Sequence, residues 1–332
     1  MNRDAICVLG AGSWGTALAI RLATNNNTTC LWGHDPAFVR SLAAERQNRV
    51  FLPGISFPTS LDIEEDLASA VQTAREILIV VPSHAFRDVL NKVAPLLDQG
   101  TRIAWATKGL EQGSGMFMSD VLEEVLGTRH PAAVVSGPTF ALEVARGLPT
   151  ALTVASTNPV FANDMAARLH GDSMRVYTSD DMLGVQLGGT VKNVLAIASG
   201  ITDGMELGAN SRAALITRGL AEIIRLGDAM GARRETLMGL SGVGDLILTC
   251  TDDLSRNRRL GLALGRGEAL DLAVREIGQV VEGFNTAGEV VQLARRYRVE
   301  MPISEQVYRV LHEGLSPQAA VQNLLARDIR SE

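Results

Sequence analysis

The 332-residue chain has little cysteine and no long hydrophobic run. These two features argue against a disulfide-rich protein and against a membrane-spanning one. Three cysteines are an odd and sparse set, so we expect no disulfide framework. Cys7 and Cys30 fall in expected strands and Cys250 in an apolar segment, where each is interpreted as a small buried hydrophobe. No apolar run approaches the roughly 18 to 20 residues of a membrane span, so no stable membrane insertion is expected.

Metal-ligand spacing and an excess of positive charge are missing as well. The five histidines are scattered, so we expect no metal site. A formal net charge of −6 and a pI near 5.5 argue against a nucleic-acid partner. A strand expected almost at the N-terminus leaves no room for a signal peptide, which favours the cytoplasm.

The pattern of the chain changes near residue 180. Before that point short apolar runs alternate with helical segments, which predicts an α/β N-terminal domain, a Rossmann-type doubly wound, mostly parallel sheet, over residues 1–181. Residues 182–332 are rich in Ala, Leu, Gly and charge at helical spacing, which predicts an all-α C-terminal domain. Two domains also suit a length that exceeds one comfortable hydrophobic core.

The expected elements follow from these runs. Strands are expected at 5–9, 28–33, 77–82, 102–107, 132–136, 150–155 and 174–178, and the parallel sheet is expected to extend to about residue 180. Residues 47–61 are expected to form a loop. Two apolar helical faces are expected in the second half, one with Leu187, Val191, Val194, Leu195 and Ala198, the other with Val321, Leu324 and Leu325 after Ser316-Pro317.

The sequence G-x-G-x-x-G at Gly10, Gly12 and Gly15 lies between the strand Ala5–Leu9 and a helical segment at 16–23. Strand, glycine turn and helix in this order are typical of a dinucleotide-binding fold. Gly10 allows the tight turn, Gly12 lets backbone amides reach a pyrophosphate, and Gly15 lets the helix pack on the strand. The helix N-terminus then offers N–H groups and partial positive charge to the anion.

An acidic residue near the end of the second strand often receives the ribose hydroxyls of NAD. Asp35 stands at that place, between His34 and Pro36. Asp35 could equally cap the helix expected at 36–46. The sequence therefore leaves the 2′ position of the cofactor open.

Two lysines are candidates for chemistry. Lys108 follows a strand at its carboxyl end, where ligands bind in such sheets, although a lone loop lysine is usually solvated. Lys192 shares a helix flank with the small residues Gly188, Gly189, Ala196 and Ser199. Small neighbours would desolvate the ammonium and make it a usable proton donor, and the alternative is a surface lysine with incidental neighbours.

The densest basic cluster is Ser255-Arg256-Asn257-Arg258-Arg259. Arginine at a helix start, beside free amides, suits a phosphate. The alternative is a solvated basic face that pairs with Asp252 and Asp253. Upstream, Asp245 lies on a glycine-flanked bend, where it could orient a lysine or cap a helix.

Taken in order, six motifs resemble the bacterial NAD(P)-dependent glycerol-3-phosphate dehydrogenases over about residues 5–325. They are Gly10-Ala-Gly-Ser-Trp-Gly15, Trp105-Ala-Thr-Lys108-Gly-Leu-Glu111, Ser136-Gly-Pro-Thr-Phe-Ala141, Gly188-Gly-Thr-Val-Lys192-Asn193, Gly242-Val-Gly-Asp245-Leu and Ser255-Arg-Asn-Arg258. The resemblance implies a dinucleotide-binding domain followed by a helical domain, in agreement with the pattern of the chain.

The resemblance also implies residue roles. Lys192 resembles the proton-transferring catalytic residue. Lys108 resembles the lysine that binds substrate near the nicotinamide, and Asp245 resembles the carboxylate that supports this site. Implied substrate contacts are Lys108, Gly137, Thr139, Lys192, Asn193, Asp245, Ser255, Arg256 and Asn257. Implied cofactor contacts are Gly10, Gly12, Ser13, Trp14, Gly15, His34, Lys108, Ala141, Arg256, Val280 and Glu282.

The reaction implied is the reversible reduction of dihydroxyacetone phosphate to sn-glycerol 3-phosphate with NAD(P)H, NADPH being slightly favoured, to supply phospholipid synthesis. The substrate is expected between the two domains, and apolar stripes in the helical half make a homodimer possible. Two alternatives stay open: a dehydrogenase for another small hydroxy acid or phosphorylated ketone, and a nucleotide-sensing protein without catalysis.

Overall fold

A computed structural model describes residues 4–328, which form two compact units. The first unit runs to Lys108 and continues from Met116 to Val185. The second consists of Gly109–Gly115 and the chain from Gln186 onward. The short segment Gly109–Gly115 thus comes from the range that the sequence assigns to the first domain but packs with the helical unit.

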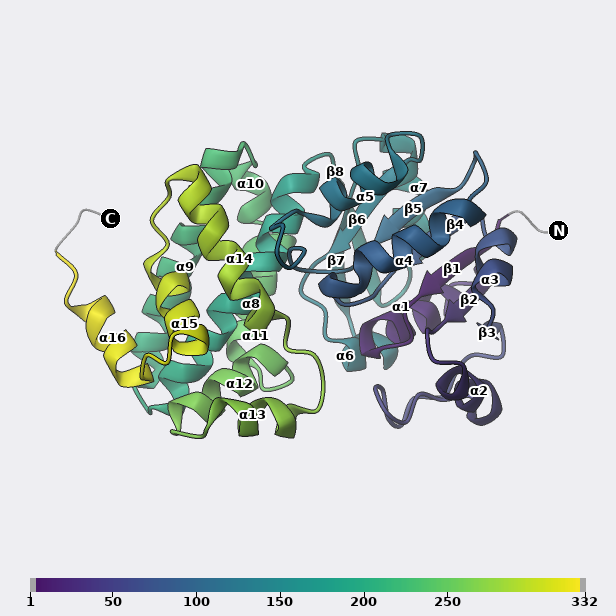
Figure 1. Cartoon of the computed structure of the whole chain (residues 1–332). Helices are drawn as coiled ribbons and strands as arrows, with labels where there is room; N and C mark the ends of the chain where they lie inside the picture. Colours follow the sequence, from purple (N-terminus) through teal and green to yellow (C-terminus); the bar gives the residue numbers. More distant parts are fainter. Residues whose placement is uncertain (1–3, 329–332) are drawn as a thin grey trace. The chain divides into compact units, whose positions relative to one another are not determined.

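An eight-stranded sheet is the centre of the first unit, with strand order β3-β2-β1-β4-β5-β6-β7-β8 (Figure 1). The strands are β1 (Ile6–Leu9), β2 (Thr29–Trp32), β3 (Leu61–Glu64), β4 (Glu76–Ile79), β5 (Arg102–Trp105), β6 (Ala132–Ser136), β7 (Thr150–Ala155) and β8 (Met174–Ser179). All neighbouring strands are parallel except β6 and β7. The predicted Rossmann-type, mostly parallel sheet is confirmed.

Two details of the sheet differ from the prediction. β7 runs antiparallel to β6, so the parallel arrangement does not continue unbroken to residue 180. The connection between them contains only the five-residue helix α6 (Ala141–Ala145), too short to carry the chain back along the sheet as a full crossover helix does. β3 was not expected: it begins at the last residue of the expected loop 47–61 and is a four-residue edge strand in which only Leu61 is buried, so it lacks the apolar run of an inner strand.

Helices cover both faces of this sheet because side chains alternate along each strand. In β1, Ile6 and Val8 join the core beneath α1, α6 and α7, whereas Cys7 and Leu9 join the core beneath α3, α4 and α5. The helical segments of the first unit are α1 (Ser13–Thr24), α2 (Pro36–Glu45), α3 (Leu67–Thr73), η1 (Ser83–Ala85), α4 (Phe86–Val93), η2 (Ala94–Leu96), α5 (Met118–Leu126), α6 and α7 (Pro159–Leu169).

The cysteines behave largely as the sequence suggests. All three are free thiols; Cys7 and Cys250 are buried and Cys30 is half-buried. Burial raises the pKa of Cys250 to about 12, which keeps this thiol protonated and unreactive near neutrality. Cys7 and Cys30 are register partners on β1 and β2, with their sulfur atoms 2.7 Å apart.

The second unit is helical. Its elements are α8 (Met182–Gly204, whose first turn belongs to the first unit), α9 (Gly208–Met230), α10 (Arg234–Leu237), the π-helical turn η3 (Leu240–Gly244), α11 (Asp245–Thr251), α12 (Arg256–Gly265), α13 (Leu270–Ile277), α14 (Glu282–Tyr297), α15 (Pro302–His312) and α16 (Pro317–Leu325). The predicted apolar face of α8 is buried, but so is nearly every other side chain between Val185 and Thr202. A helix buried on all sides is the core element of its unit.

Glycines let α8 approach its neighbours closely. A Cβ atom added to Gly200 would lie 2.1 Å from the Arg258 carbonyl oxygen, and one added to Gly261 would lie 2.1 Å from the Ile197 carbonyl oxygen. Gly204 and Gly265 repeat this contact one turn further along both helices. α8 and α12 therefore pack backbone to backbone, which brings short side chains on the two helices within reach of each other.

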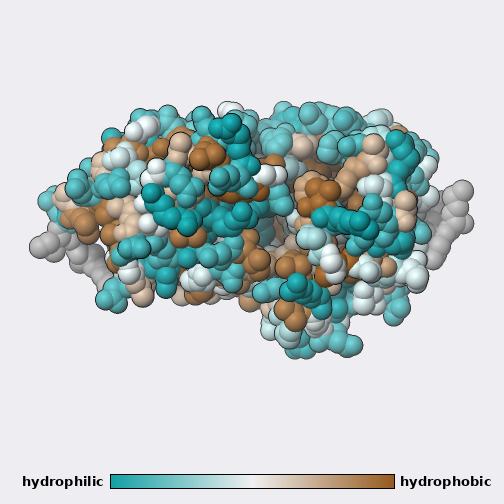
Figure 2. All heavy atoms as spheres, turned by 90° about the horizontal axis from the view of Figure 1, so that it is seen from below, coloured by the Kyte–Doolittle hydropathy of each residue, from teal (hydrophilic) through white to brown (hydrophobic). Residues whose placement is uncertain are grey.

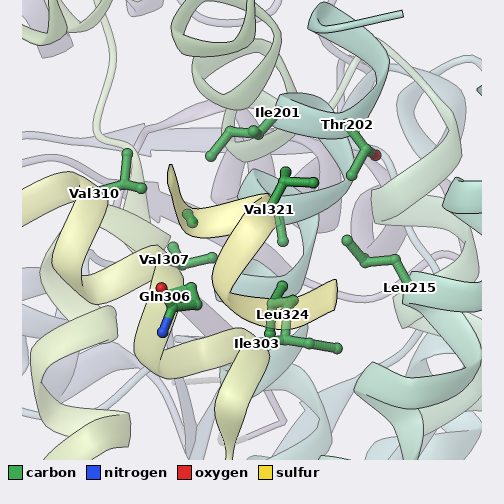
Figure 3. Close-up of a pocket in the computed structure, with 11 residues that line it drawn as sticks. Ile201, Thr202, Leu215, Ile303, Gln306, Val307, Val310, Val321 and Leu324 are labelled. Atoms are coloured by element: carbon green, nitrogen blue, oxygen red, sulfur yellow. The ribbon is translucent and has the colours of Figure 1, made fainter. Parts of the chain in front are cut away.

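The C-terminal helix α16 lines a small apolar hollow together with α8, α9 and α15 (Figure 3). Val321 and Leu324 line this hollow as the predicted stripe requires. Leu325 does not: 81% of its surface is exposed, because α16 rests on the unit by one narrow side.

Hydrophobic side chains appear as scattered patches among hydrophilic ones on the face shown in Figure 2. Within residues 4–328, no helix has both the length and the apolar character needed to cross a membrane.

Candidate active site

The glycine turn of the first unit has the shape that a nucleotide pyrophosphate needs. Gly10 has φ +127°, and an added Cβ would lie 2.2 Å from the Val80 carbonyl oxygen; at Gly15 it would lie 1.8 Å from the Gly10 carbonyl oxygen. At Gly12, by contrast, nothing lies within 4 Å of an added Cβ. Gly10 and Gly15 are thus required for close packing, and Gly12 leaves open space beside the backbone.

The start of α1 completes this cradle. Gly12 is the N-cap and supplies no side-chain cap, and the Thr16 amide is the donor to its carbonyl oxygen. The amides of the first helical turn before Thr16 therefore lack partners within the helix. Oriented N–H groups and the helix dipole suit an anion, so these residues fit the diphosphate of NAD(P)H.

Asn48 holds the glycine turn in place, a role that no sequence pattern predicts. Its side chain is fully buried and donates to the Ala11 carbonyl oxygen (3.0 Å) and to Thr16 Oγ1 (2.9 Å). Its own oxygen accepts from the Phe51 amide, and Ser13 Oγ donates to the Phe51 carbonyl oxygen. The loop expected at 47–61 is therefore tied to the cofactor motif.

Other expected cofactor contacts lie around the same turn. Trp14 is half-buried, and its indole N–H is buried with no partner among residues 4–328. His34 is exposed after β2. The open question at Asp35 has an answer: its Oδ1 accepts from the amides of Ala37 and Phe38, so Asp35 caps α2. Ala141 begins α6 and packs on the same core as α1.

A second corner of the first unit collects Lys108, Gly137 and Thr139. Lys108 follows β5, and its Nζ donates to the Gly137 carbonyl oxygen at 3.1 Å. Gly137 follows β6, and Thr139 Oγ1 donates to the same oxygen at 3.2 Å. Both strands end at one edge of the sheet, which brings these three expected substrate contacts together.

In the second unit, Lys192 is buried against a carboxylate. Its Nζ donates to Asp245 Oδ1 at 2.5 Å and to Thr249 Oγ1 at 2.9 Å, and the side chains of Lys192 and Asp245 are 8% and 1% exposed. The alternative of a surface lysine is thereby excluded, as is that of an Asp245 that only caps a helix. Burial disfavours an ammonium, and the facing carboxylate stabilises it.

The short elements around Asp245 explain its position. Asp245 begins α11 directly after the π-helical turn η3, a rare geometry that often marks functional sites. A Cβ on Gly188 would lie 2.4 Å from the Ser241 carbonyl oxygen, so α8 and η3 are in backbone contact. Thr249, one helical turn after Asp245, was not anticipated; the i, i+4 spacing was the signal available in the sequence.

Asn193, Asn257 and Gly283 form a buried chain of hydrogen bonds. The Asn257 amide nitrogen donates to Asn193 Oδ1, and Asn257 Oδ1 accepts from the Gly283 amide, both at 2.9 Å. A Cβ on Gly283 would lie 2.6 Å from the Asn193 carbonyl oxygen. These bonds join α8, α12 and the start of α14 at a point adjacent to Lys192.

Two arginines at the start of α12 differ in their hydrogen-bond partners. Arg258 is bonded to Asp203 (2.5 Å) and Asp253 (2.9 Å); burial works to lower its pKa, but these carboxylates leave it raised. Arg256 forms no ion pair within residues 4–328 and has only Gln279 Oε1 at 3.3 Å. Burial lowers the pKa of Arg256, and the charge of Glu282 offsets this only in part.

The remaining expected residues surround Arg256. Ser255 caps α12, since its Oγ accepts from the Arg258 amide at 3.2 Å. Glu282 begins α14, and Val280, 37% exposed, lies just before it. The amides at the first positions of α12 therefore lie beside a guanidinium that has no carboxylate partner in the described chain, an arrangement that suits a phosphate.

Comparison with known proteins shows the family of the chain. A family model described as the N-terminus of NAD-dependent glycerol-3-phosphate dehydrogenase matches residues 5–162, and the model of its C-terminus matches residues 181–322. The chain belongs to the NAD-dependent glycerol-3-phosphate dehydrogenase family. The recognition made from the six sequence motifs is confirmed.

Similar proteins match this chain over nearly their full length. A glycerol-3-phosphate dehydrogenase (NAD(P)+) of Shewanella oneidensis is 57% identical and matches 100% of this chain and 99% of its own length. One of Aeromonas hydrophila is 58% identical with the same coverage. The crystal structure of glycerol-3-phosphate dehydrogenase from Coxiella burnetii superposes with a TM-score of 0.95 at 50% identity, covering 98% of this chain and 99% of the other.

The chain is therefore an oxidoreductase that interconverts dihydroxyacetone phosphate and sn-glycerol 3-phosphate with NAD(P)H, as the sequence predicted. The roles of individual residues in this family member stay predictions.

Proposed function

We propose that Lys192 donates the proton in the reduction of dihydroxyacetone phosphate. The observation that carries this assignment is the buried Lys192–Asp245–Thr249 cluster. A nicotinamide cofactor supplies the hydride to the ketone carbon when it is bound. The Lys192 ammonium stabilises the developing alkoxide and transfers a proton to it, while Asp245 and Thr249 hold the nitrogen in position.

The phosphate of the substrate is assigned to the start of α12. Arg256 supplies a guanidinium that can bind two phosphate oxygens, and the first amides of the helix supply further donors. The Asn257 side chain is engaged with Asn193 and Gly283, so its substrate contact is assigned to its backbone amide. The Ser255 cap holds the start of α12 in place. The hydrogen bond from Asn257 to Asn193 holds this helix start against α8.

Lys108, Gly137 and Thr139 are assigned to the substrate from the side of the cofactor domain. Lys108 Nζ and Thr139 Oγ1 meet at the Gly137 carbonyl oxygen, which orients both at the end of the sheet where ligands bind. The expected cofactor contacts begin with the cradle of Gly10, Gly12 and Gly15. The others are Ser13, Trp14, His34, Lys108, Ala141, Arg256, Val280 and Glu282.

NADPH is the preferred cofactor in this proposal. Asp35 Oδ1 is engaged as the cap of α2, which leaves only its Oδ2 for the 2′-hydroxyl of NADH. His34, exposed beside it, can face a 2′-phosphate. The ratio of kcat/KM for NADPH to that for NADH checks this, and a value well below one would contradict it.

The cellular setting belongs to the same proposal. We assign the enzyme to the cytoplasm, where its product would supply phospholipid synthesis, and to a homodimer formed through the helical unit, which exposes Leu325 and other apolar side chains. Light scattering on the purified protein tests the dimer, and a monomer mass would contradict it.

The substrate assignment is tested by assaying the purified protein with dihydroxyacetone phosphate, with unphosphorylated dihydroxyacetone and with a 2-keto acid. We expect the phosphate ester to be reduced with a kcat/KM at least about 100-fold higher than either of the other two substrates, because these leave the half-buried Arg256 guanidinium without a phosphate. Comparable rates with all three would contradict the phosphate site.

A further inference from the structure

The segment Gly109–Gly115 connects two parts of the first unit but packs within the second. It begins directly after Lys108 and ends directly before Met116. Gly109, Gly113 and Gly115 all have positive φ, at +121°, +87° and +66°. The backbone therefore turns repeatedly, which confines the segment to a compact loop. We call it the Lys108 strap.

Within the strap, Leu110 is buried and the Gly115 amide bonds to the Glu111 carbonyl oxygen at 3.0 Å. Ser114 Oγ donates to the Glu111 carboxylate at 2.6 Å. The strap thus has its own internal structure, and its position depends on what holds it.

Glu289 of α14 is one side chain that holds the strap in the second unit. Glu289 Oε1 accepts from the Gly113 amide at 2.9 Å, and a Cβ placed on Gly115 would lie 3.3 Å from Glu289 Oε2. Both oxygens of one carboxylate therefore lie against the strap. Glu289 is only 6% exposed, and its Oε2 has no hydrogen-bond partner among the described residues.

A buried carboxylate with one hydrogen bond is costly to keep, since its second oxygen has lost its water. Simple packing would be served better by an apolar side chain of similar size. This energetic cost of burying Glu289 is expected if its hydrogen bond to the strap serves the reaction.

The N-terminal end of α14 indicates that purpose. Its first turn contains Gly283, whose amide bonds to Asn257 beside the proposed phosphate site. Glu289 lies on the same helix, less than two turns further on. One rigid helix thus contacts both the phosphate corner and the strap that continues directly from Lys108.

We propose that Glu289 is a positioning residue for Lys108. Its carboxylate fixes the strap on α14, and the strap fixes the backbone that carries Lys108. The inference rests on the proposed role of Lys108 in substrate binding.

The test compares Glu289→Ala, Glu289→Gln and the control Gln292→Ala, which removes an exposed side chain from the next turn of α14. Glu289→Ala should lower kcat/KM for dihydroxyacetone phosphate about 10- to 100-fold, mainly through KM, since a small displacement of a binding group has effects of this size. Glu289→Gln keeps an oxygen for the Gly113 amide and should recover most of the activity. Equal losses in Glu289→Gln and Glu289→Ala would overturn the proposal.

Binding of NADPH separates positioning from misfolding. The Kd of NADPH should change less than about 3-fold in Glu289→Ala, because Lys108 is only one of the proposed cofactor contacts and the glycine turn is left unchanged. A loss of cofactor binding in parallel with the loss of activity would show a general structural defect and overturn the proposal.

A double-mutant cycle decides whether the effect passes through Lys108. In the Lys108→Ala background, Glu289→Ala should lower kcat/KM by less than about 2-fold further, because the group that it positions is absent. The same fold loss in both backgrounds would overturn the role of Glu289 and leave that of Lys108 intact. A Lys108→Ala enzyme with normal kcat/KM would instead overturn the assignment of Lys108, and the inference with it.

Discussion

Each unit buries a carboxylate against cations, and the two clusters are built for different purposes. In the first unit, Glu76 of β4 contacts Arg102, its register partner on β5, and Arg168 of α7 (2.6 Å). In the second, Asp245 contacts Lys192. Glu76 and Arg102 lie at the amino ends of their strands, the edge opposite to that where ligands bind.

The chemistry of the two cations explains the difference. A guanidinium stays protonated at any physiological pH, and here each arginine also reaches a further carboxylate, Asp164 or Asp4. Burial works to lower the pKa of Arg102, but its bonds to Asp164 and Glu76 leave it raised. An ammonium can transfer a proton, and Lys192 faces one carboxylate and one hydroxyl. The Lys192–Asp245 pair can therefore take part in proton transfer as proposed, whereas the arginines around Glu76 cannot.

The largest effect that we expect tests the structural cluster. Glu76→Gln leaves two buried guanidinium groups without their shared carboxylate, so the free energy of unfolding should fall by about 3–5 kcal/mol. Denaturant unfolding measures this loss. The control Asp164→Asn removes a half-exposed partner of the same arginine and should change stability by about 0–1 kcal/mol. Equal, small losses would show that Glu76 does not hold the cluster together.

A smaller effect is expected at the phosphate site, where two arginines of one helix can be compared. Arg256→Ala should raise KM for dihydroxyacetone phosphate about 10- to 100-fold, the range for losing a charge-assisted hydrogen bond. Arg259→Ala, which removes an exposed side chain from the same helix, should leave KM unchanged. Steady-state kinetics with both variants check this, and similar KM values for them would remove Arg256 from the phosphate site.

The smallest effect concerns Glu222, a buried carboxylate that forms no ion pair in the described chain. It accepts from the Ile303 and Ser304 amides and from Ser304 Oγ, yet burial raises its pKa to about 7. A carboxyl whose pKa is higher in the folded state contributes stability below its unfolded pKa and loses it as pH rises through the folded value. Wild type should lose about 1 kcal/mol of unfolding free energy between about pH 6 and pH 8.

Glu222→Gln removes the titrating group and should show no such loss over the same range of pH. Unfolding curves of both proteins at each pH provide the comparison. A variant that loses stability with pH just as wild type does would assign the pH dependence to another group.

The sequence was most informative where the chemistry depends on local order. Gly10, Gly12 and Gly15 act within one turn, so their spacing alone predicts the cradle. The alternation of apolar runs predicted seven of the eight strands, and β3 was missed because a short edge strand needs little apolar surface. The role of Asp35 stayed ambiguous in the sequence, because a helix cap and a ribose ligand both require a carboxylate at this position.

Contacts between distant segments were beyond the reach of these patterns. Asn48 is an ordinary loop residue in the sequence, and only the fold shows its amide bonded to Ala11 and Thr16. The same holds for Glu289, whose partner Gly113 is far away in the chain. Lys192 and Asp245 could be proposed as partners through family resemblance, but their contact depends on the packing of α8 against η3 and α11.

The turnover of Lys192→Ala, measured together with its Kd for NADPH, tests the central claim most directly. The account predicts a kcat lower by about 100- to 10,000-fold, the range for losing a positioned proton donor, with cofactor affinity close to that of wild type. Near-native turnover in this variant would contradict the assignment of Lys192 as the proton donor.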